Sequence, residues 1–382
     1  MAVAGAGAFG RNHLRVLREI ESAGHGAALV AAVEPDPTRA AEASGQYGIP
    51  VFSSIPELLA AGLKLDAAVV AVPTVHHHAV ASELLDAGLH LLVEKPLAAN
   101  LAEADDLIAR AKRTGRILQP GHLERFNPAV LAIEPRLTRP MFFEAHRLSV
   151  FTPRSLDVDV VLDLMIHDLD IVLTFAASPV REVRAVGLPI LSPKVDIANV
   201  RVEFESGCVA NFTASRVSTE RVRKLRFFEP RQYVSIDYAR RDVLEIRVGE
   251  NKNGIAATAG DISREAGAKL PPEVMAATAS ANIAPGTVDP ALLAKLAQAA
   301  QIAGKPPALP GLEFSKPQIT PGEPLRLEIE SFLQAVRTRR TPHVTPQQGR
   351  AALELALTIQ TTMAAHAERA GLSDFFNPSG NN

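Results

Sequence analysis

The sequence predicts an α/β protein made of two differently built domains. Over residues 1–122, short apolar strands alternate with helices, which is the pattern of a doubly wound parallel sheet with right-handed crossovers. Between about residue 200 and residue 248, polar and apolar side chains alternate strictly, which is typical of a mostly antiparallel sheet with one buried face. We therefore expect a parallel-sheet domain at 1–122 and an α+β domain at 123–382.

Composition limits the classes of partner. A chain of 382 residues is long enough for two domains with cores of their own. Its 40 basic and 42 acidic residues leave a net charge of −2, so we expect no nucleic acid and no anionic membrane as a partner. Cys208 is the single cysteine, which excludes an internal disulfide and fits a reducing compartment. With no apolar run of roughly 18 residues and no signal-peptide layout, we expect a soluble, cytoplasmic protein.

The first strand runs directly into a glycine-rich turn. Residues 2–4 are apolar, residues 5–10 have the pattern G-x-G-x-x-G, and leucine and isoleucine then recur at helical spacing. In this context the glycines predict the dinucleotide site of a Rossmann domain, with Gly7 giving a pyrophosphate access to the backbone at the start of a helix. The predicted cofactor contacts in this turn are Gly5, Gly7, Ala8, Phe9 and Gly10. The strand starts at the initiator methionine, so a natural start a few residues upstream is an open alternative.

A carboxylate ends the second predicted strand, at residues 28–33. Glu34 stands where such folds bind the ribose hydroxyls of the adenosine, and its charge would repel a 2′-phosphate. The sequence therefore favours NAD over NADP. The alternative is that Glu34 only caps the turn at residues 35–37.

The same alternation continues to residue 119. We expect strands near 51 and at 67–72, 91–94 and 116–119, and helices at 37–47, 55–61, 76–87 and 101–114. The strand at 91–94 ends in Glu94-Lys95-Pro96, and Pro96 keeps Lys95 extended, so its amine projects from the carboxyl end of the strand, where ligands bind in open α/β sheets. The alternative is a solvated lysine that follows a core strand.

Three consecutive histidines follow the strand at 67–72. Neighbouring residues on a helix point about 100 degrees apart, so His76, His77 and His78 cannot share one ion, and we expect no metal. One of the three is a candidate for a place near the nicotinamide.

A helix predicted at 157–175 carries the second group of candidate catalytic residues. Asp163 and His167 are four residues apart and Asp170 follows three residues later, so acid, imidazole and acid share one face. A carboxylate one turn away orients an imidazole that acts as a general base. A histidine that simply packs in the core is an equally weighted alternative.

The alternating strands of the second domain are expected at 142–149, 200–205, 208–215, 225–228, 233–238 and 243–248. Six basic residues are distributed across them, either on an exposed face or converging on a diphosphate: Arg216, Arg221, Arg223, Lys224, Arg226 and Arg231. The exposed sheet face favours self-association. Residues 250–322 are rich in alanine, proline and glycine and are predicted to be a flexible insertion with one helix at 290–303. Helices are expected at 324–338 and 346–370, before a loose tail after residue 373.

In combination these motifs resemble the glucose-fructose oxidoreductase, inositol dehydrogenase and MocA (Gfo/Idh/MocA) family. The resemblance rests on Gly5-x-Gly7-x-x-Gly10, Glu34, Val72-Pro73-Thr74-x-x-His77, Glu94-Lys95-Pro96, Asp163-x-x-x-His167 and Glu323-Pro324-Leu325. It implies catalytic positions at Lys95, Asp163 and His167, a cis bond before Pro96, and further cofactor contacts at Pro73, Thr74, His77, Glu94 and Lys95. The chain departs from the family pattern at Asp159, Val160 and Met165, where glycines are common.

Within that family, residues 121–128, 163–168 and 215–221 are similar to the UDP-N-acetylglucosamine 3-dehydrogenase branch. This resemblance implies that NAD-dependent oxidation of a secondary hydroxyl gives a 3-keto sugar nucleotide, a precursor of amino sugars for lipid A or polysaccharide. His167 would accept the proton, Asp163 would hold its tautomer, and Lys95 would stabilise the alkoxide, although Lys95 as the base remains open. The further substrate candidates are Arg125, Asn127, Arg216 and Arg223.

Two rival functions remain at this stage. One is a dehydrogenase of a free sugar or inositol, for which the basic cluster is mere surface. The other is a non-catalytic sensor that keeps the dinucleotide, although a sensor has no need of a set of proton-transfer groups. In either case we expect a small-molecule ligand and a homodimer or homotetramer.

Overall fold

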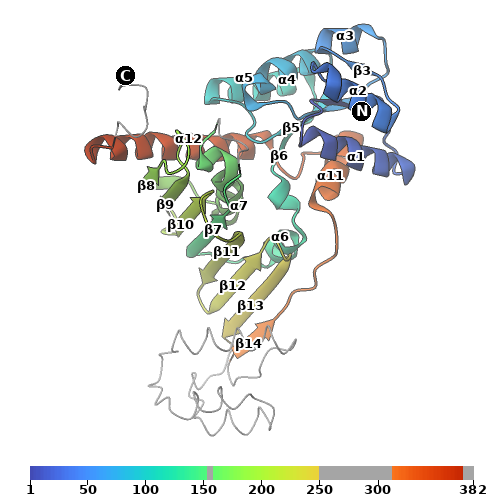
Figure 1. Ribbon diagram of the computed structural model, residues 1–382. Coiled ribbons are helices and arrows are strands. Elements are labelled where there is room, and N and C mark those ends of the chain that lie inside the picture. Colours follow the sequence, from blue (N-terminus) through green and yellow to red (C-terminus); the bar gives the residue numbers. More distant parts are fainter. Residues whose placement is uncertain (153–157, 249–311, 373–382) are drawn as a thin grey trace, which may run out of the picture.

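The computed structural model describes residues 1–152, 158–248 and 312–372, which form two sheets with helices (Figure 1). The first sheet has six parallel strands in the order β3-β2-β1-β4-β5-β6. Its strands are β1 (Ala2–Ala4), β2 (Ala31–Val33), β3 (Val51–Phe52), β4 (Ala67–Val70), β5 (His90–Glu94) and β6 (Leu118–Gly121). The order reverses between β1 and β4, and ligands bind at such a reversal in open α/β sheets.

The helices of this domain are α1 (Gly10–Ser22), α2 (Pro37–Tyr47), α3 (Ile55–Ala60), the 3₁₀ turn η1 (Thr74–His76), α4 (His77–Asp86) and α5 (Leu101–Thr114). Side chains of Asp36, Ser54 and Asn100 cap the N-termini of α2, α3 and α5. The predicted parallel α/β sheet is therefore confirmed. Some strand ends differ, because β2 begins only at Ala31 and β4 ends at Val70.

The second sheet has eight strands in the order β14-β13-β12-β11-β7-β10-β9-β8. They are β7 (Phe142–Leu148), β8 (Val180–Leu188), β9 (Ile197–Phe204), β10 (Val209–Ser215), β11 (Val222–Glu229), β12 (Gln232–Asp237), β13 (Asp242–Val248) and β14 (Leu312–Ser315). The sheet is mixed, since β7 and β10 are parallel while the other neighbours are antiparallel. The mostly antiparallel α+β prediction is therefore confirmed.

Short helical segments connect and cover this sheet. They are η2 (Leu123–Phe126), α6 (Pro128–Ile133), η3 (Glu134–Arg136), the π-helix η4 (Val161–Met165) and α7 (Ile166–Ala176). The helix predicted at 157–175 therefore consists of a π-helical turn followed by an α-helix. Apolar side chains of η4 and α7 pack with the inner sheet face in one large core that also includes the buried Cys208.

Two strands of the second sheet correct the sequence prediction. The edge strand β8 was not predicted, because Arg181, Glu182 and Arg184 interrupt its apolar pattern. The strand β14 lies inside the stretch predicted as a flexible insertion at 250–322, and it pairs with β13. The predicted helix at 290–303 and the tail after 373 lie outside the described residues.

Two helices close the chain. The first, α11 (Pro324–Thr338), returns to the Rossmann domain and packs beside α1, where Leu325, Ile329 and Phe332 join its core. The second, α12 (Pro346–Arg369), runs along β8 and α7 and also contacts α5 and β6 (Figure 1). Both helices thereby hold the two sheets together. None of the helices in the described part of the chain combines the length and the apolar character that a membrane crossing requires.

Candidate active site

The glycine turn between β1 and α1 is shaped for close approach. Gly5 has a φ of +95°, and a Cβ there would lie 2.6 Å from the carbonyl oxygen of Ala71. A Cβ on Gly10 would lie 1.9 Å from the carbonyl oxygen of Gly5, whereas one on Gly7 would meet nothing within 4 Å. Gly5 and Gly10 are therefore required by the turn itself, and the open side at Gly7 fits a pyrophosphate at the start of α1.

Glu34, at the end of β2, is 4% exposed and lies beside this turn. Its Oε2 accepts from the amide of Ala6 at 2.8 Å, and its Oε1 accepts from the amide of Asp36 at 3.0 Å and from Arg39 at 2.8 Å. Burial alone would raise the pKa of Glu34, but these hydrogen bonds hold it below its ordinary value. Glu34 thus joins the glycine turn to β2 and also caps the following turn, so the two interpretations of this residue are compatible.

The segment after β4 supports the Lys95-Pro96 turn. Pro73 precedes η1, which begins at Thr74. The buried ring of His77 contacts two carbonyl oxygens, with Nδ1 2.8 Å from that of Pro96 and Nε2 2.9 Å from that of Val72. His77 therefore links the segments that follow β4 and β5, and its contact with a cofactor stays a prediction.

The Glu94-Lys95-Pro96 segment connects the two domains. The Lys95-Pro96 peptide bond is cis, which confirms the expectation from the family resemblance. The buried Glu94 contacts His13 of α1, with 2.7 Å between Oε1 and Nε2. Half-buried Lys95 donates from Nζ to the carbonyl oxygen of Asp163 at 2.7 Å. The amine of the first domain therefore reaches the π-helix of the second.

Opposing influences set the protonation of Lys95. Burial lowers its pKa below the ordinary value, while the negative charges of Asp163 and Glu94 act in the opposite direction. Asp163 therefore acts on Lys95 twice, through its backbone carbonyl and through its carboxylate.

His167 lies in the first turn of α7 and is half-buried. Burial lowers the pKa of His167 well below its ordinary value, and the nearby charges of Lys95 and Arg147 lower it further. At neutral pH the imidazole is therefore uncharged and can accept a proton. Among the charges that lower the pKa of His167, that of Lys95 has the largest effect. The amine and the imidazole therefore interact electrostatically.

Asp163 and His167 are four residues apart, with Asp163 in the π-helical turn and His167 in the first turn of α7. Nδ1 of His167 has no hydrogen-bond partner among the described residues. That Asp163 holds the tautomer of His167 stays a prediction.

The departures from the family glycines have a structural explanation. Asp159 accepts from the amides of Val161 and Leu162 at 2.9 and 3.1 Å and so begins the π-helix. Its other oxygen accepts from Gln360 of α12 at 2.5 Å. Val160 and Met165 are buried in the second core.

Beneath His167, a buried ion pair that we did not predict anchors α7 to the sheet. Arg147 of β7 donates to both oxygens of Asp168, at 2.7 and 3.1 Å, and to Glu124 at 3.1 Å. The sequence does contain a signal, because Arg147 continues the inward-facing series of Phe143 and Ala145. An arginine on a buried strand face needs a buried acid.

Two of the four basic or polar substrate candidates belong to the scaffold around η2. Arg125 is 2% exposed and bonds to Thr174 and, at 3.4 Å, to Glu134. Asn127 is the N-cap of α6, and its amide also donates to the carbonyl oxygen of Tyr238 at 3.1 Å. Both side chains therefore have structural partners in this scaffold, and their role as substrate contacts stays a prediction.

The basic cluster does not converge as a unit. Arg216 is buried and donates to Asp196 at 2.7 Å, to Ser192 at 2.9 Å and to the carbonyl oxygen of Val158 at 2.9 Å. It has a structural role, and its contact with the substrate stays a prediction. Arg223 is exposed and pairs in register with the inward-facing Arg147, which places it on the α7 side of the sheet.

The remaining members of the cluster lie elsewhere. Lys224 and Arg226 alternate with Arg223 and so project from the opposite sheet face, where Arg226 lies 3.7 Å from Glu144. Arg231 occupies the β11–β12 turn with a φ of +67°. Arg223 is therefore the substrate candidate of this cluster that also lowers the pKa of His167 through its charge.

Comparison with known proteins agrees with this geometry. Residues 1–122 match the oxidoreductase family with an NAD-binding Rossmann fold, and residues 130–231 match the GFO/IDH/MocA C-terminal domain. The chain is 30% identical over 368 residues to UDP-N-acetylglucosamine 3-dehydrogenase of Acidithiobacillus ferrooxidans, covering 96% of this chain and 98% of that protein. A solved structure of that enzyme, GnnA, superimposes with a TM-score of 0.75 over 95% of this chain and 97% of that one, at 30% identity.

A second relative broadens the comparison. The scyllo-inositol 2-dehydrogenase (NAD(+)) of Bacillus subtilis is 27% identical over 232 residues, which cover 57% of this chain and 67% of that protein. The family matches agree with the glycine turn and with the cis Lys95-Pro96 bond. They also agree with the effect of the charge of Lys95 on His167. The chain belongs to the Gfo/Idh/MocA family of NAD-binding oxidoreductases that act on CH–OH groups.

Proposed function

We propose that this oxidoreductase oxidises the 3-hydroxyl of UDP-N-acetylglucosamine to a 3-keto sugar nucleotide, a precursor for amino sugars of lipid A or polysaccharide. The observation that carries the chemistry is the 2.7 Å hydrogen bond from Lys95 to the carbonyl oxygen of Asp163, which brings the amine to the helix of His167. The choice of substrate is supported by the 30% identity to the A. ferrooxidans enzyme over 96% of the chain.

The cofactor supplies the two-electron acceptor for this oxidation when it is bound. On the protein side, the backbone at Gly7 and the start of α1 would hold the pyrophosphate, and Glu34 would hold the ribose. The Lys95-Pro96 turn, supported by His77, would lie beside the reacting carbon.

His167 accepts the proton of the hydroxyl in this mechanism. Its lowered pKa keeps the imidazole neutral at pH 7, as a general base must be before it acts. Lys95 stabilises the alkoxide that develops on the substrate oxygen. Burial lowers the pKa of Lys95, and the negative charge of Asp163 opposes this effect and so favours the protonated amine. The reverse assignment, with Lys95 as base, predicts a different pH profile and is tested below.

A nucleotide sugar also brings a diphosphate, which needs a cation near the site. Arg223 is exposed at the end of β11 on the side of α7, close enough to act on the pKa of His167. Its forked donors suit a diphosphate. We therefore place the diphosphate near Arg223.

A free polyol is the second candidate substrate, because an inositol dehydrogenase is among the relatives. Thermal unfolding in the presence of NAD separates the two. A substrate stabilises the folded state according to its concentration relative to Kd. UDP-N-acetylglucosamine should raise the Tm and free inositol should not, and stabilisation by inositol alone would overturn the proposal. A non-catalytic sensor would bind NAD but reduce none with either compound.

We further propose a homodimer or homotetramer formed through the open face of the second sheet. Phe142, Phe228 and Tyr233 stack in a row on this face, with ring centroids 5.5 and 5.2 Å apart, and all three are only half-buried. Such an apolar row is typical of an interface. We also propose a cytoplasmic location, because a nucleotide-sugar substrate and NAD are both available there.

A further inference from the structure

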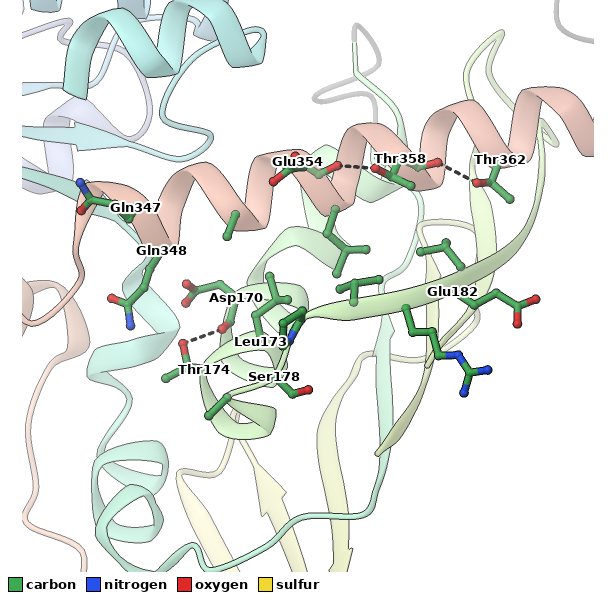
Figure 2. A pocket seen from close by; sticks show the side chains of 17 residues that line it. Asp170, Leu173, Thr174, Ser178, Glu182, Gln347, Gln348, Glu354, Thr358 and Thr362 are labelled. Atoms are coloured by element: carbon green, nitrogen blue, oxygen red, sulfur yellow. Dashed lines mark hydrogen bonds between the residues drawn. The ribbon is translucent and has the colours of Figure 1, made fainter. Parts of the chain in front are cut away.

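A pocket of about 890 Å³ lies between α7, β8 and α12, away from the predicted cofactor contacts (Figure 2). Figure 2 shows Gln348, Glu354 and Thr358 of α12 along one side of it, and its described lining residues include none of those contacts. A buried polar contact at the glycine turn, between His13 of α1 and Glu94 of β5, lies by contrast directly beside them.

His13 occupies a position of α1 where the fold alone would favour an apolar side chain. It lies on the buried face of the helix, in register with Leu17 and Ile20, and is 0% exposed. A buried polar ring costs free energy of folding unless its nitrogens are hydrogen-bonded, and Nδ1 of His13 has no hydrogen-bond partner among the described residues. Residues that fit the fold poorly in this way are expected at functional sites.

The other ring nitrogen of His13 holds the carboxylate of Glu94. Nε2 lies 2.7 Å from Oε1, and because a carboxylate only accepts, Nε2 carries the proton and donates it. The second oxygen, Oε2, packs over the backbone of β6, where a Cβ on Gly121 would lie 3.1 Å from it. The carboxylate is therefore fixed from two sides. The side chain of Glu94 is still 10% exposed, whereas that of His13 is 0% exposed.

The pair connects the glycine turn to the candidate catalytic lysine. Phe9 of the turn meets the ring of His13 edge-on, with 5.7 Å between the centroids and 64° between the planes. Glu94 is followed directly by Lys95, whose Nζ donates to the carbonyl oxygen of Asp163 at 2.7 Å. Direct contacts therefore run from the turn before α1 to the amine.

Glu94 also lies on the side of the sheet where the nicotinamide half of a dinucleotide belongs. The two halves bind on opposite sides of the reversal in strand order. Glu34, at the end of β2, is the candidate for the adenosine ribose, so the nicotinamide half falls on the side of β4 and β5. That half carries hydrogen-bond donors in its ribose hydroxyls and its carboxamide, and a carboxylate at the end of β5 can accept from either.

We propose that His13 is a positioning residue, which holds Glu94 by Oε1 so that Oε2 accepts a hydrogen bond from the nicotinamide half of NAD. His13 is not among the predicted cofactor contacts, and it acts on the cofactor only through Glu94. The proposal rests on NAD as the cofactor of the proposed function and not on the identity of the sugar.

Calorimetric titration of the full-length protein with ADP, ADP-ribose and NAD tests the proposal without a substrate. ADP lacks the second ribose, and ADP-ribose lacks only the nicotinamide. In His13→Leu we expect the Kd for NAD to rise about tenfold, the scale of one charge-assisted hydrogen bond, and the Kd for ADP to stay within about twofold. A higher Kd for ADP-ribose as well assigns the contact to the ribose hydroxyls, and a higher Kd for NAD alone assigns it to the carboxamide.

Thermal stability and a conservative variant separate positioning from folding. Without cofactor, the Tm of His13→Leu should equal or exceed that of the wild type, because leucine suits the buried face of α1. His13→Gln, whose amide N–H reaches the place of Nε2, should restore the Kd for NAD to within about threefold of the wild type. His25→Leu, at a histidine with a 54% exposed side chain after α1, is the matched control and should leave every Kd unchanged.

A second pair of variants tests whether His13 acts through Glu94. Glu94→Gln should raise the Kd for NAD by a similar factor, and its combination with His13→Leu should raise it no further, because the two residues share one contact. His13→Asn, whose side chain is too short to reach Glu94, takes the place of His13→Leu if that variant does not fold.

Three results would overturn the proposal: an equal loss of affinity for ADP and NAD in a folded His13 variant, an unchanged Kd for NAD, or additive losses in the combined variant. A loss that His13→Gln does not restore would do the same. If the wild type binds NAD but does not oxidise the UDP-sugar, the proposed substrate fails and these binding measurements keep their meaning.

Discussion

Nζ of Lys95 and the carbonyl oxygen of Asp163 lie 2.7 Å apart, and this hydrogen bond joins the NAD-binding sheet to the helix that carries His167. The charge of the amine also lowers the pKa of His167, although Lys95 and His167 belong to different domains. Burial lowers the pKa values of both Lys95 and His167.

Replacing Lys95 should remove stabilisation of the alkoxide. For Lys95→Met we expect kcat to fall by about 10²- to 10⁴-fold, because one positioned charge contributes at this scale. NAD binding, measured by calorimetry, should change little. Lys64→Met on the exposed surface of the same domain is the control. A Lys95→Met enzyme with normal kcat would show that the amine has no catalytic role.

The pH profile assigns the acid and the base. The pKa of His167 lies well below 6.5, so the imidazole is already neutral at pH 6.5, and kcat/KM should fall only on further acidification. The pKa of Lys95 lies below 10.5, so kcat/KM should fall on the alkaline side before that pH as the amine loses its charge. Lys95→Arg should shift the alkaline limb upward, since guanidinium stays charged. If Lys95 were the base, activity would instead rise as the amine deprotonates.

Glu34 should set the choice of cofactor. Glu34→Ala removes the acceptor for the ribose and frees Arg39, which now bonds to Oε1 at 2.8 Å, to meet a 2′-phosphate. We expect the ratio of kcat/KM for NAD to that for NADP to fall by about tenfold or more, since hydrogen bonds to charged groups contribute about 1.5–3 kcal/mol. Glu57→Ala, on an exposed helix, is the control. If the ratio of kcat/KM for NAD to that for NADP did not change, Glu34 would have only a structural role in the turn.

Arg223 and Lys224 offer a matched pair for the diphosphate. They are neighbours on β11, but Arg223 faces the α7 side and Lys224 the open face. Arg223→Ala should raise KM for the UDP-sugar by about ten- to a hundredfold through loss of a charge-assisted hydrogen bond. Lys224→Ala should leave KM as it is. Equal effects of the two substitutions would remove the assignment of Arg223.

The fold was predictable because its signals are local. A strand, a glycine turn and a helix follow one another within residues 2–22, and the alternation of β9 to β13 is visible in each strand. The strands β8 and β14 were missed because edge strands tolerate charge and four residues give too short a pattern.

The site was predictable only in part. Lys95 and His167 could be identified from the sequence motifs in which they lie. The hydrogen-bond partners of Arg125, Asn127 and Arg216, in contrast, are distant in sequence. Asp196, for example, accepts from Arg216, and no local pattern in the sequence relates the two. Whether a polar residue faces a ligand or a buried partner is decided by tertiary packing.

The proposed oxidation can be measured by incubating the purified protein with NAD and UDP-N-acetylglucosamine. The absorbance of NADH and the mass of the sugar nucleotide are followed together. We expect NADH to form in step with a product lighter by two hydrogen atoms, and both signals to be lost in Lys95→Met and His167→Asn. An unchanged sugar nucleotide and no NADH, from a protein that still binds NAD, would rule out this activity.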